Sequence, residues 1–220
     1  MTKAQKRLLL AIGLIAAITV LPILNLAWLP LGYFYTSIHE LCHALAAVVS
    51  GGKVHFLQVF ADGSGVTQSA GANPLFVAPA GYVGAAIVAG LFVYAGKTER
   101  TARLALQITA WTLVLSSVLW LRGDLVGVLA TVFWILLLFL AAYKAENEYV
   151  QLVVQSLGMA LALASVRSVF SLVGLVSLEH QMNDAVILQE VSGIPAMLSA
   201  CVWVLLNFTA VGLALKKSWN

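Results

Sequence analysis

The chain has 220 residues, of which 61% are hydrophobic and only 10% are charged. Soluble domains carry about 25% charged residues, so this composition excludes an ordinary soluble protein and indicates an integral membrane protein. The formal net charge of +3 is small and spread over chain ends and loops, which favours contact with lipid headgroups and excludes a nucleic-acid-binding surface.

The length limits the number of membrane helices. A helix that crosses the hydrocarbon core needs about 20 apolar residues, so the chain has room for about six to seven of them and for no sizeable soluble domain. We predict an all-α integral membrane protein with about six to seven transmembrane helices, built as one polytopic domain over residues 1–220.

The first apolar run covers residues 8–28 and follows a short basic segment. It is too long for the apolar part of a signal peptide, and no small-residue cleavage site follows, so we expect a retained span with a kink at Pro22. Pro30 should then break the chain before a second span over residues 34–50. Further apolar runs predict the later helices, at residues 73–95, 104–121, 125–143, 149–178 and 194–215. The run over residues 149–178 is long enough to hold a span plus a broken or interfacial helix.

The most informative stretch is His39-Glu40-Leu41-Cys42-His43, which lies in the second span. Histidines four positions apart share one face of a helix and can bind a single ion, and Glu40 lies where it can take a proton from a metal-bound water. A capping box between Ser37 and Glu40 is the structural alternative. Ionisable residues in an apolar span are costly and usually functional. The motif therefore predicts one Zn²⁺ per chain, with His39 and His43 as ligands and Glu40 as the catalytic base.

Residues 54–69 have strand-like composition on both sides of an Ala-Asp-Gly-Ser-Gly turn signal at residues 61–65. We predict a small membrane-associated β-hairpin inserted after the motif helix, and an ordinary surface loop is the alternative. An exposed strand edge beside a protease site can hold an extended peptide by backbone pairing. His55 is expected to be a hairpin residue and not a ligand.

A catalytic zinc usually takes three protein ligands, so one more must come from elsewhere in the chain. Asp184 is the first candidate, because it lies between two apolar stretches at a possible helix start. An aspartate there would ordinarily cap the helix, which is the structural alternative. His180 and Glu190 are the reserve candidates. Counting Lys and Arg on alternating loops of seven spans does not decide the membrane orientation.

These motifs together resemble the site-2 protease family of intramembrane zinc metalloproteases, in a compact bacterial-type branch without a PDZ domain. The family commonly shows Asn, Pro and then Leu-Asp-Gly at the distal motif, whereas here no Pro precedes Asp184 and Ala185 replaces the Gly. The residues that carry the resemblance are 39–44, 51–54, the hairpin, Pro79-Ala80-Gly81 and Asn183-Asp184-Ala185.

The resemblance implies a multi-pass protein of a bacterial cell membrane that cuts membrane-spanning proteins within or near the bilayer, often to release a regulator. We expect a zinc endopeptidase whose substrate pairs with the hairpin. Two other classes use the same residues differently. A metal-ion transporter would bind the ion transiently, and a non-catalytic relative would bind membrane partners without cutting them.

Overall fold

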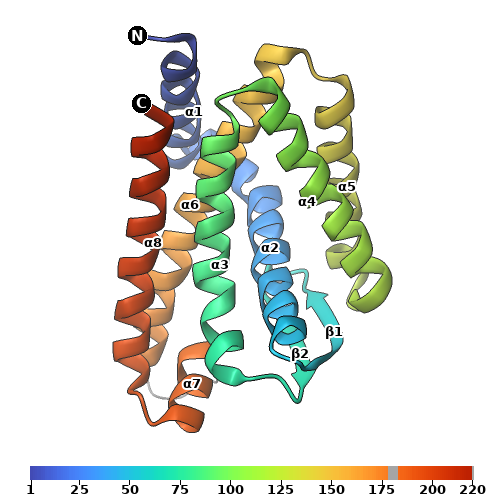
Figure 1. The fold of residues 1–220 in the computed structure, drawn as a ribbon, viewed down its shortest axis with the longest axis vertical. Helices are drawn as coiled ribbons and strands as arrows, with labels where there is room; N and C mark the ends of the chain where they lie inside the picture. Colours follow the sequence, from blue (N-terminus) through green and yellow to red (C-terminus); the bar gives the residue numbers. More distant parts are fainter. Residues whose placement is uncertain (178–182, 220) are drawn as a thin grey trace.

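The computed structural model describes residues 1–177 and 183–219 (Figure 1). It confirms a mostly helical protein with one small antiparallel sheet. The elements are α1 (Lys3–Val20), a 3₁₀ helix η1 (Pro22–Ala27), α2 (Trp28–Val49), β1 (Lys53–Val59), β2 (Gly65–Ala70), α3 (Pro74–Ala95), α4 (Glu99–Trp120), α5 (Leu125–Lys144), α6 (Asn147–Ser177), α7 (Asp184–Ser192) and α8 (Ala196–Trp219).

Five helices in the described part of the chain are long and apolar enough to cross a membrane: α3, α4, α5, α6 and α8. They support the prediction of an integral membrane protein, but they do not confirm the predicted six to seven spans. Of the helices outside this group, α7 is too short to cross a membrane, and α1 and α2 have clear reasons to differ. Three cations lie near the start of α1, and α2 carries the polar residues of the motif.

The first two helices begin and end differently from the prediction. Instead of one span kinked at Pro22, α1 ends at Val20, and Leu21 is extended with φ −87° and ψ 115°. A residue before proline disfavours the helical conformation, which explains the end of α1. The predicted break at Pro30 is also wrong, because Pro30 lies in the first turn of α2. The missing N–H of proline costs nothing there.

The predicted break within residues 149–178 is wrong for the described part of that run, because α6 is one helix of 31 residues. At 1.5 Å per residue it is about 46 Å long, which exceeds the roughly 30 Å hydrocarbon core of a bilayer. The helix must therefore tilt or extend beyond the hydrocarbon.

The predicted hairpin is confirmed. β1 and β2 pair antiparallel, with Leu57 opposite Thr67 and a bulge between Val54 and Phe56. At the turn, the Ser64 hydroxyl and N–H donate to Asp62 Oδ1 at 2.6 and 2.9 Å. These hydrogen bonds hold the pKa of the Asp62 carboxyl below its usual value.

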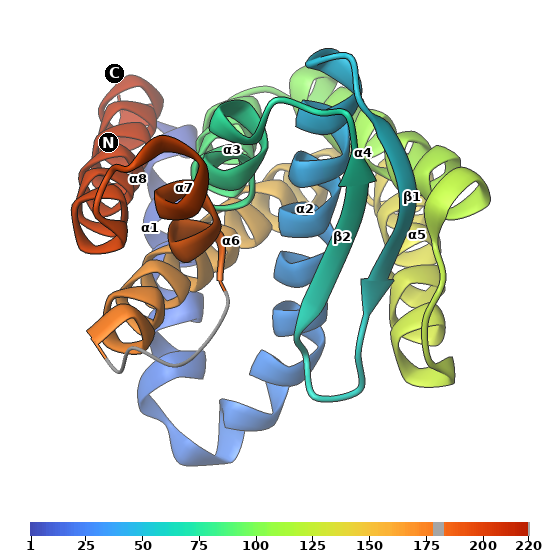
Figure 2. The same ribbon diagram turned by 90° about the horizontal axis from the view of Figure 1, so that it is seen from below.

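The hairpin lies alongside α2, next to the ends of α4 and α5 (Figure 2). The Tyr33 hydroxyl of α2 donates to the Ala61 carbonyl at 2.6 Å, and the Thr36 hydroxyl donates to the Gly63 carbonyl at 2.7 Å. From the other side, Ala61 N donates to Asp124 Oδ2 at 2.8 Å. The turn is thus attached both to the motif helix and to the start of α5.

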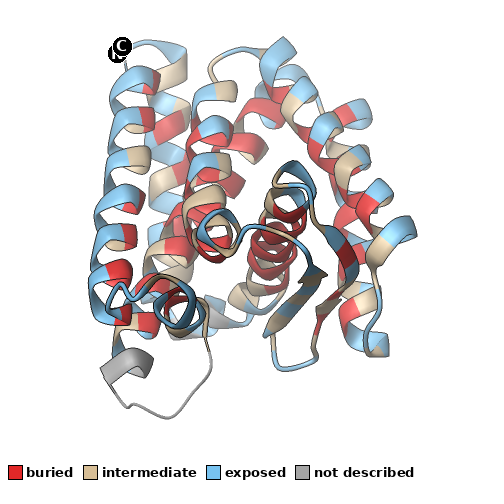
Figure 3. Ribbon diagram, turned by 60° about the horizontal axis from the view of Figure 1, so that its bottom comes forward, coloured by how far each residue is buried: buried red, intermediate tan, exposed pale blue. Residues whose placement is uncertain are grey.

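The centre of the bundle is built around α2. Every residue from 33 to 41 is buried, so this part of α2 is covered on all faces (Figure 3). Phe34 is fully buried and stacks on Trp134 of α5, with ring centroids 4.5 Å apart. Ala85 and Ala89 of α3 are also fully buried in this core, and small residues let helices pack closely in lipid.

Candidate metal centre

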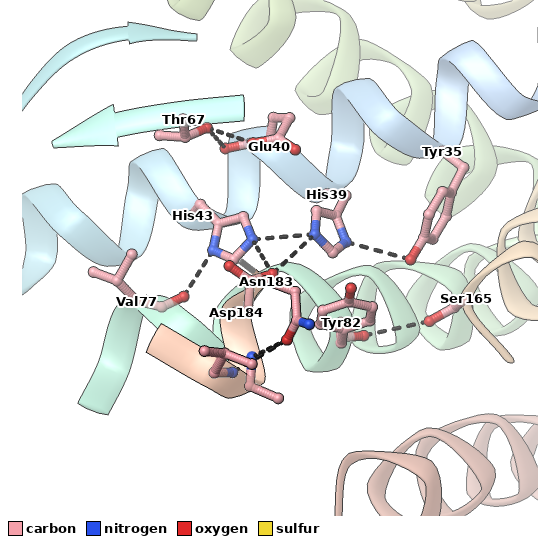
Figure 4. A network of polar contacts seen from close by, with 12 residues as sticks. Tyr35, His39, Glu40, His43, Thr67, Val77, Tyr82, Ser165, Asn183 and Asp184 are labelled. Atoms are coloured by element: carbon pink, nitrogen blue, oxygen red, sulfur yellow. Dashed lines mark hydrogen bonds and ion pairs between the residues drawn. The ribbon is translucent and has the colours of Figure 1, made fainter. Parts of the chain in front are cut away.

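His39 and His43 lie one turn apart on α2 and point toward the same place (Figure 4). Their Nε2 atoms are 3.1 Å apart, and both residues are buried. Tyr82 of α3 packs its ring against the edge of the His39 ring at 4.6 Å between centroids. The predicted pairing of the two imidazoles is therefore present in the structure.

Asp184 is the first residue of α7 and brings a carboxylate to the two imidazoles. Its Oδ2 atom lies 3.3 Å from His43 Nε2 and 3.7 Å from His39 Nε2. The helix cap is supplied by Asn183, whose Oδ1 accepts from the N–H groups of Ala185 and Val186 at 3.1 Å each. The alternative of Asp184 as the cap is thus wrong, because the preceding residue fills that position.

The three donor atoms are spaced as a tetrahedral metal site requires. Ligands at about 2.0–2.1 Å from a tetrahedral zinc lie roughly 3.4 Å from one another. The triangle formed by the two Nε2 atoms and Oδ2 has sides of 3.1, 3.3 and 3.7 Å. His39, His43 and Asp184 could therefore hold one metal ion together.

Neighbouring groups orient both imidazoles for this role. The Nδ1 atom of His43 lies 2.7 Å from the Val77 carbonyl of α3, and that of His39 lies 3.3 Å from the Tyr35 hydroxyl. A carbonyl only accepts, so Nδ1 of His43 carries the proton in this contact, which leaves the lone pair of Nε2 for a metal ion. With an ion on Nε2, His39 donates from Nδ1 to the Tyr35 oxygen in the same way.

Gly81 of α3 has no side chain, and the two imidazoles occupy the space that a side chain would fill. A Cβ atom at Gly81 would collide with the Nε2 atoms of His39 and His43. Any larger residue would displace α3 or the ligands, because both imidazoles are held by hydrogen bonds on their far sides. The Pro79-Ala80-Gly81 segment therefore contributes to the site by bringing the α3 backbone close to the two ligands.

Glu40 points toward β2 of the hairpin (Figure 4). The Thr67 hydroxyl of β2 lies 2.8 Å from Glu40 Oε2 and 2.9 Å from the Glu40 carbonyl oxygen. A Cβ atom at Gly65 would lie 2.7 Å from the Glu40 side chain, so the strand approaches closely because Gly65 has none. β2 thus covers and orients the predicted base, which is buried.

The ligand residues and Glu40 line one cavity of about 1200 Å³ between α2, β2, α3, α6 and α7. This volume exceeds the roughly 300–1,000 Å³ of typical small-molecule sites. One wall is β2, whose residues from Gly65 to Ser69 line the cavity in sequence. A cavity of this size, with a strand along it, suits an extended chain better than a compact small molecule.

The remaining candidates from the sequence are not brought to the site within the described residues. His55 is exposed on β1, which fits the expected hairpin role, and Glu190 is exposed on α7 outside the ligand group. His180 lies outside the described residues. No motif in the sequence marks Tyr35, which contacts His39 within α2, or Thr67, which reaches Glu40 only when β2 packs on α2.

The model of the protein family described as Peptidase M50B-like matches residues 10–214 of the chain. The chain belongs to the peptidase M50B-like family. This membership confirms the resemblance to site-2 proteases and supports a membrane peptidase. No curated protein and no solved structure matches the chain.

Replacing Gly81 with Ala should strongly reduce binding of a divalent metal, because the new Cβ occupies the space of the two Nε2 atoms. Metal content of the purified protein, measured by mass spectrometry of the bound element, tests this. Gly13→Ala on α1 is the matched control, since nothing lies within 4 Å of a Cβ there. Normal metal content in Gly81→Ala would contradict the tight fit.

Proposed function

We propose that this protein is a zinc-dependent intramembrane endopeptidase that cuts membrane-spanning proteins. The observation that carries the proposal is the triangle of His39, His43 and Asp184 donors, with sides of 3.1–3.7 Å, in the membrane domain of an M50B-like peptidase. In this proposal the chain is one domain, and α1 and α2 also lie within the bilayer.

His39, His43 and Asp184 hold the ion in the proposed mechanism. When bound, zinc supplies Lewis-acid chemistry that lowers the pKa of water toward neutrality and polarises a peptide carbonyl. Glu40 takes the proton of the attacking water and delivers it to the leaving nitrogen. The Thr67 hydroxyl donates to Oε2, so Oε1 is left to carry the moving proton.

The substrate must be extended where it is cut. A helical substrate shields its backbone in intrahelical hydrogen bonds, and the membrane interior offers no water to replace them. We propose that the substrate pairs its backbone with the edge of β2 that does not pair with β1, beside Glu40 in the cavity. The strand would then both stabilise the unwound substrate and orient the base.

Glu40→Gln and Asp184→Asn separate the two parts of the mechanism. We expect Glu40→Gln to keep its zinc and to lose cleavage by about 10²-fold or more, since it cannot accept a proton. Asp184→Asn should lose both zinc and cleavage. Zinc content and cleavage of a transmembrane substrate in detergent are the measurements, and the exposed Glu190→Gln is the control. Wild type without zinc, or an active Glu40→Gln, contradicts the proposed function.

Thr67→Val removes the hydroxyl that holds Glu40 while keeping the shape of the side chain. A hydrogen bond to a charged group contributes about 1.5–3 kcal/mol, so kcat should fall on the order of 10-fold or more. KM and zinc content should stay close to wild type, and Thr67→Ser should restore most of kcat. Equal losses in Thr67→Val and Thr67→Ser would instead indicate a packing role.

Disulfide cross-linking tests the pairing of substrate with β2. Val66→Cys, in an inactive Glu40→Gln chain, should cross-link to single cysteines placed beside the cleavage site of the substrate. His55→Cys is the matched control, because His55 is also exposed but lies on β1. Equal cross-linking from both strands, or none from Val66→Cys, would exclude β2 as the docking edge.

A further inference from the structure

One cation lies in the wall of the cavity that holds the candidate metal centre. Arg167 of α6 lines this cavity together with His39, Glu40 and Asp184. It is the only lysine or arginine that lines the cavity in the described part of the chain. An ionisable side chain in a membrane-spanning helix is costly and usually has a function. The mechanism proposed above gives Arg167 no role.

The guanidinium of Arg167 has no hydrogen-bond acceptor and no ion-pair partner among the described residues. It lies against Trp28 of α2, with Cζ 5.4 Å from the centroid of the indole ring, which is within the range of a cation–π contact. Trp28 lines the same cavity. A cation–π contact uses none of the five N–H donors of a guanidinium, so these donors remain for a ligand.

Arg103 of α4 shows how this protein holds an arginine that has a structural role. Its guanidinium donates to Glu99 Oε1 at 2.9 Å. It also donates to the Ala142 and Ala145 carbonyls at the carboxyl end of α5, at 2.7 and 2.9 Å. Arg167 makes no such hydrogen bonds with the described residues, so joining helices in this way does not account for its charge.

The carboxylates that line the cavity are all engaged elsewhere. Asp184 faces the two imidazoles, Glu40 accepts from β2, and Asp62 accepts from its own turn. None of the three forms an ion pair with Arg167. The positive charge of Arg167 is therefore available to a molecule that enters the cavity.

We propose that Arg167 binds an acidic side chain of the substrate and thereby selects which membrane proteins are cut. This inference rests on the proposed peptidase function. A guanidinium presents paired N–H groups that match the two oxygens of a carboxylate. Acidic side chains are rare in membrane-spanning segments because they are costly there. A substrate that carries one gains a partner in Arg167, so this contact restricts cleavage to a small class of membrane proteins.

The direction of β2 relates the acidic residue to the cleaved bond. β2 runs alongside α2 in the same direction, with the hairpin turn toward the start of α2 (Figure 2). The Thr36 hydroxyl contacts the Gly63 carbonyl at the turn, whereas Ser50, just after α2, accepts from Asn73 N beyond the end of β2 at 3.2 Å. A substrate that pairs with β2 therefore extends from the metal centre toward the start of α2 in one direction.

This geometry gives the expected position of the acidic residue in the substrate. Trp28, which contacts Arg167, is the first residue of α2 and precedes His39 by eleven residues. Eleven residues of helix are about 16 Å long. An extended chain covers this distance in roughly five residues. We therefore expect the acidic residue about five positions from the cleaved bond, on the side that lies toward the hairpin turn.

Cleavage of a matched substrate series tests the proposal. A single Glu is moved through positions three to seven on each side of the cleaved bond of a transmembrane substrate, with Gln at each position as the reference. For wild type, kcat/KM should be about ten-fold or more higher with Glu at the best position, since a hydrogen bond to an ionised group contributes about that factor. Arg167→Gln should lose this preference. The exposed Arg100→Gln on α4 is the matched control and should keep it. No preference in wild type, or an unchanged preference in Arg167→Gln, overturns the proposal.

Charge reversal separates recognition from a structural role. Arg167→Glu should prefer a substrate with Lys over one with Gln at the same position, whereas a variant that is only misfolded would cut every substrate poorly. Equal losses for all substrates, with no preference for Lys, would indicate a structural role or binding of lipid phosphate. In that case the proposal fails, and adding phosphatidylglycerol to the assay would tell these two roles apart.

Binding measurements keep this inference separate from the proposed function. The Glu40→Gln chain should bind the substrate with Glu about ten-fold more tightly than the one with Gln, measured by fluorescence anisotropy of labelled substrate in detergent. If wild type cuts neither substrate but this binding preference is present, the peptidase function is wrong and Arg167 is still a carboxylate site. If wild type cuts both equally and binding shows no preference, the peptidase function stands and the role of Arg167 is wrong.

Discussion

Polar groups buried in an apolar bundle need polar partners, and this requirement accounts for what surrounds α2. The His43 imidazole has the Val77 carbonyl of α3, and the Glu40 carboxylate has the Thr67 hydroxyl of β2. Asp184 of α7 faces both imidazoles. The elements α3, β2 and α7 each contribute one group. Removing any of them would leave a buried polar atom of α2 without its partner.

Much of the fold was predictable because its signals are local. Apolar runs mark the long helices, and the Ala-Asp-Gly-Ser-Gly turn marks the hairpin, since each pattern reflects neighbours in the chain. The spacing of His39 and His43 also predicts a shared face, because it follows from helix geometry alone. Asp184 was harder to assign, because an aspartate at a helix start is ordinarily a cap. The preceding Asn183 takes that role in the structure.

The rest depends on how distant segments pack, which no short pattern encodes. Thr67 and Tyr35 carry no motif, yet they contact the predicted base and a predicted ligand. The start of α2 was placed too late because Pro30 breaks a helix interior but is tolerated in a first turn. The position of the amino terminus beside the carboxyl terminus likewise depends on a contact between the two ends of the chain, from Gln5 to the Trp219 carbonyl.

The order of the three proposed ligands along the chain has a consequence for synthesis. Two of them are on α2, near the amino terminus, whereas Asp184 begins a short helix that precedes only α8. A chain emerging from the ribosome therefore completes its first six long helices before the set of proposed ligands is complete. The centre closes only when the last fifth of the protein enters the membrane, so under the proposed function a partly made chain could not cut the membrane proteins around it.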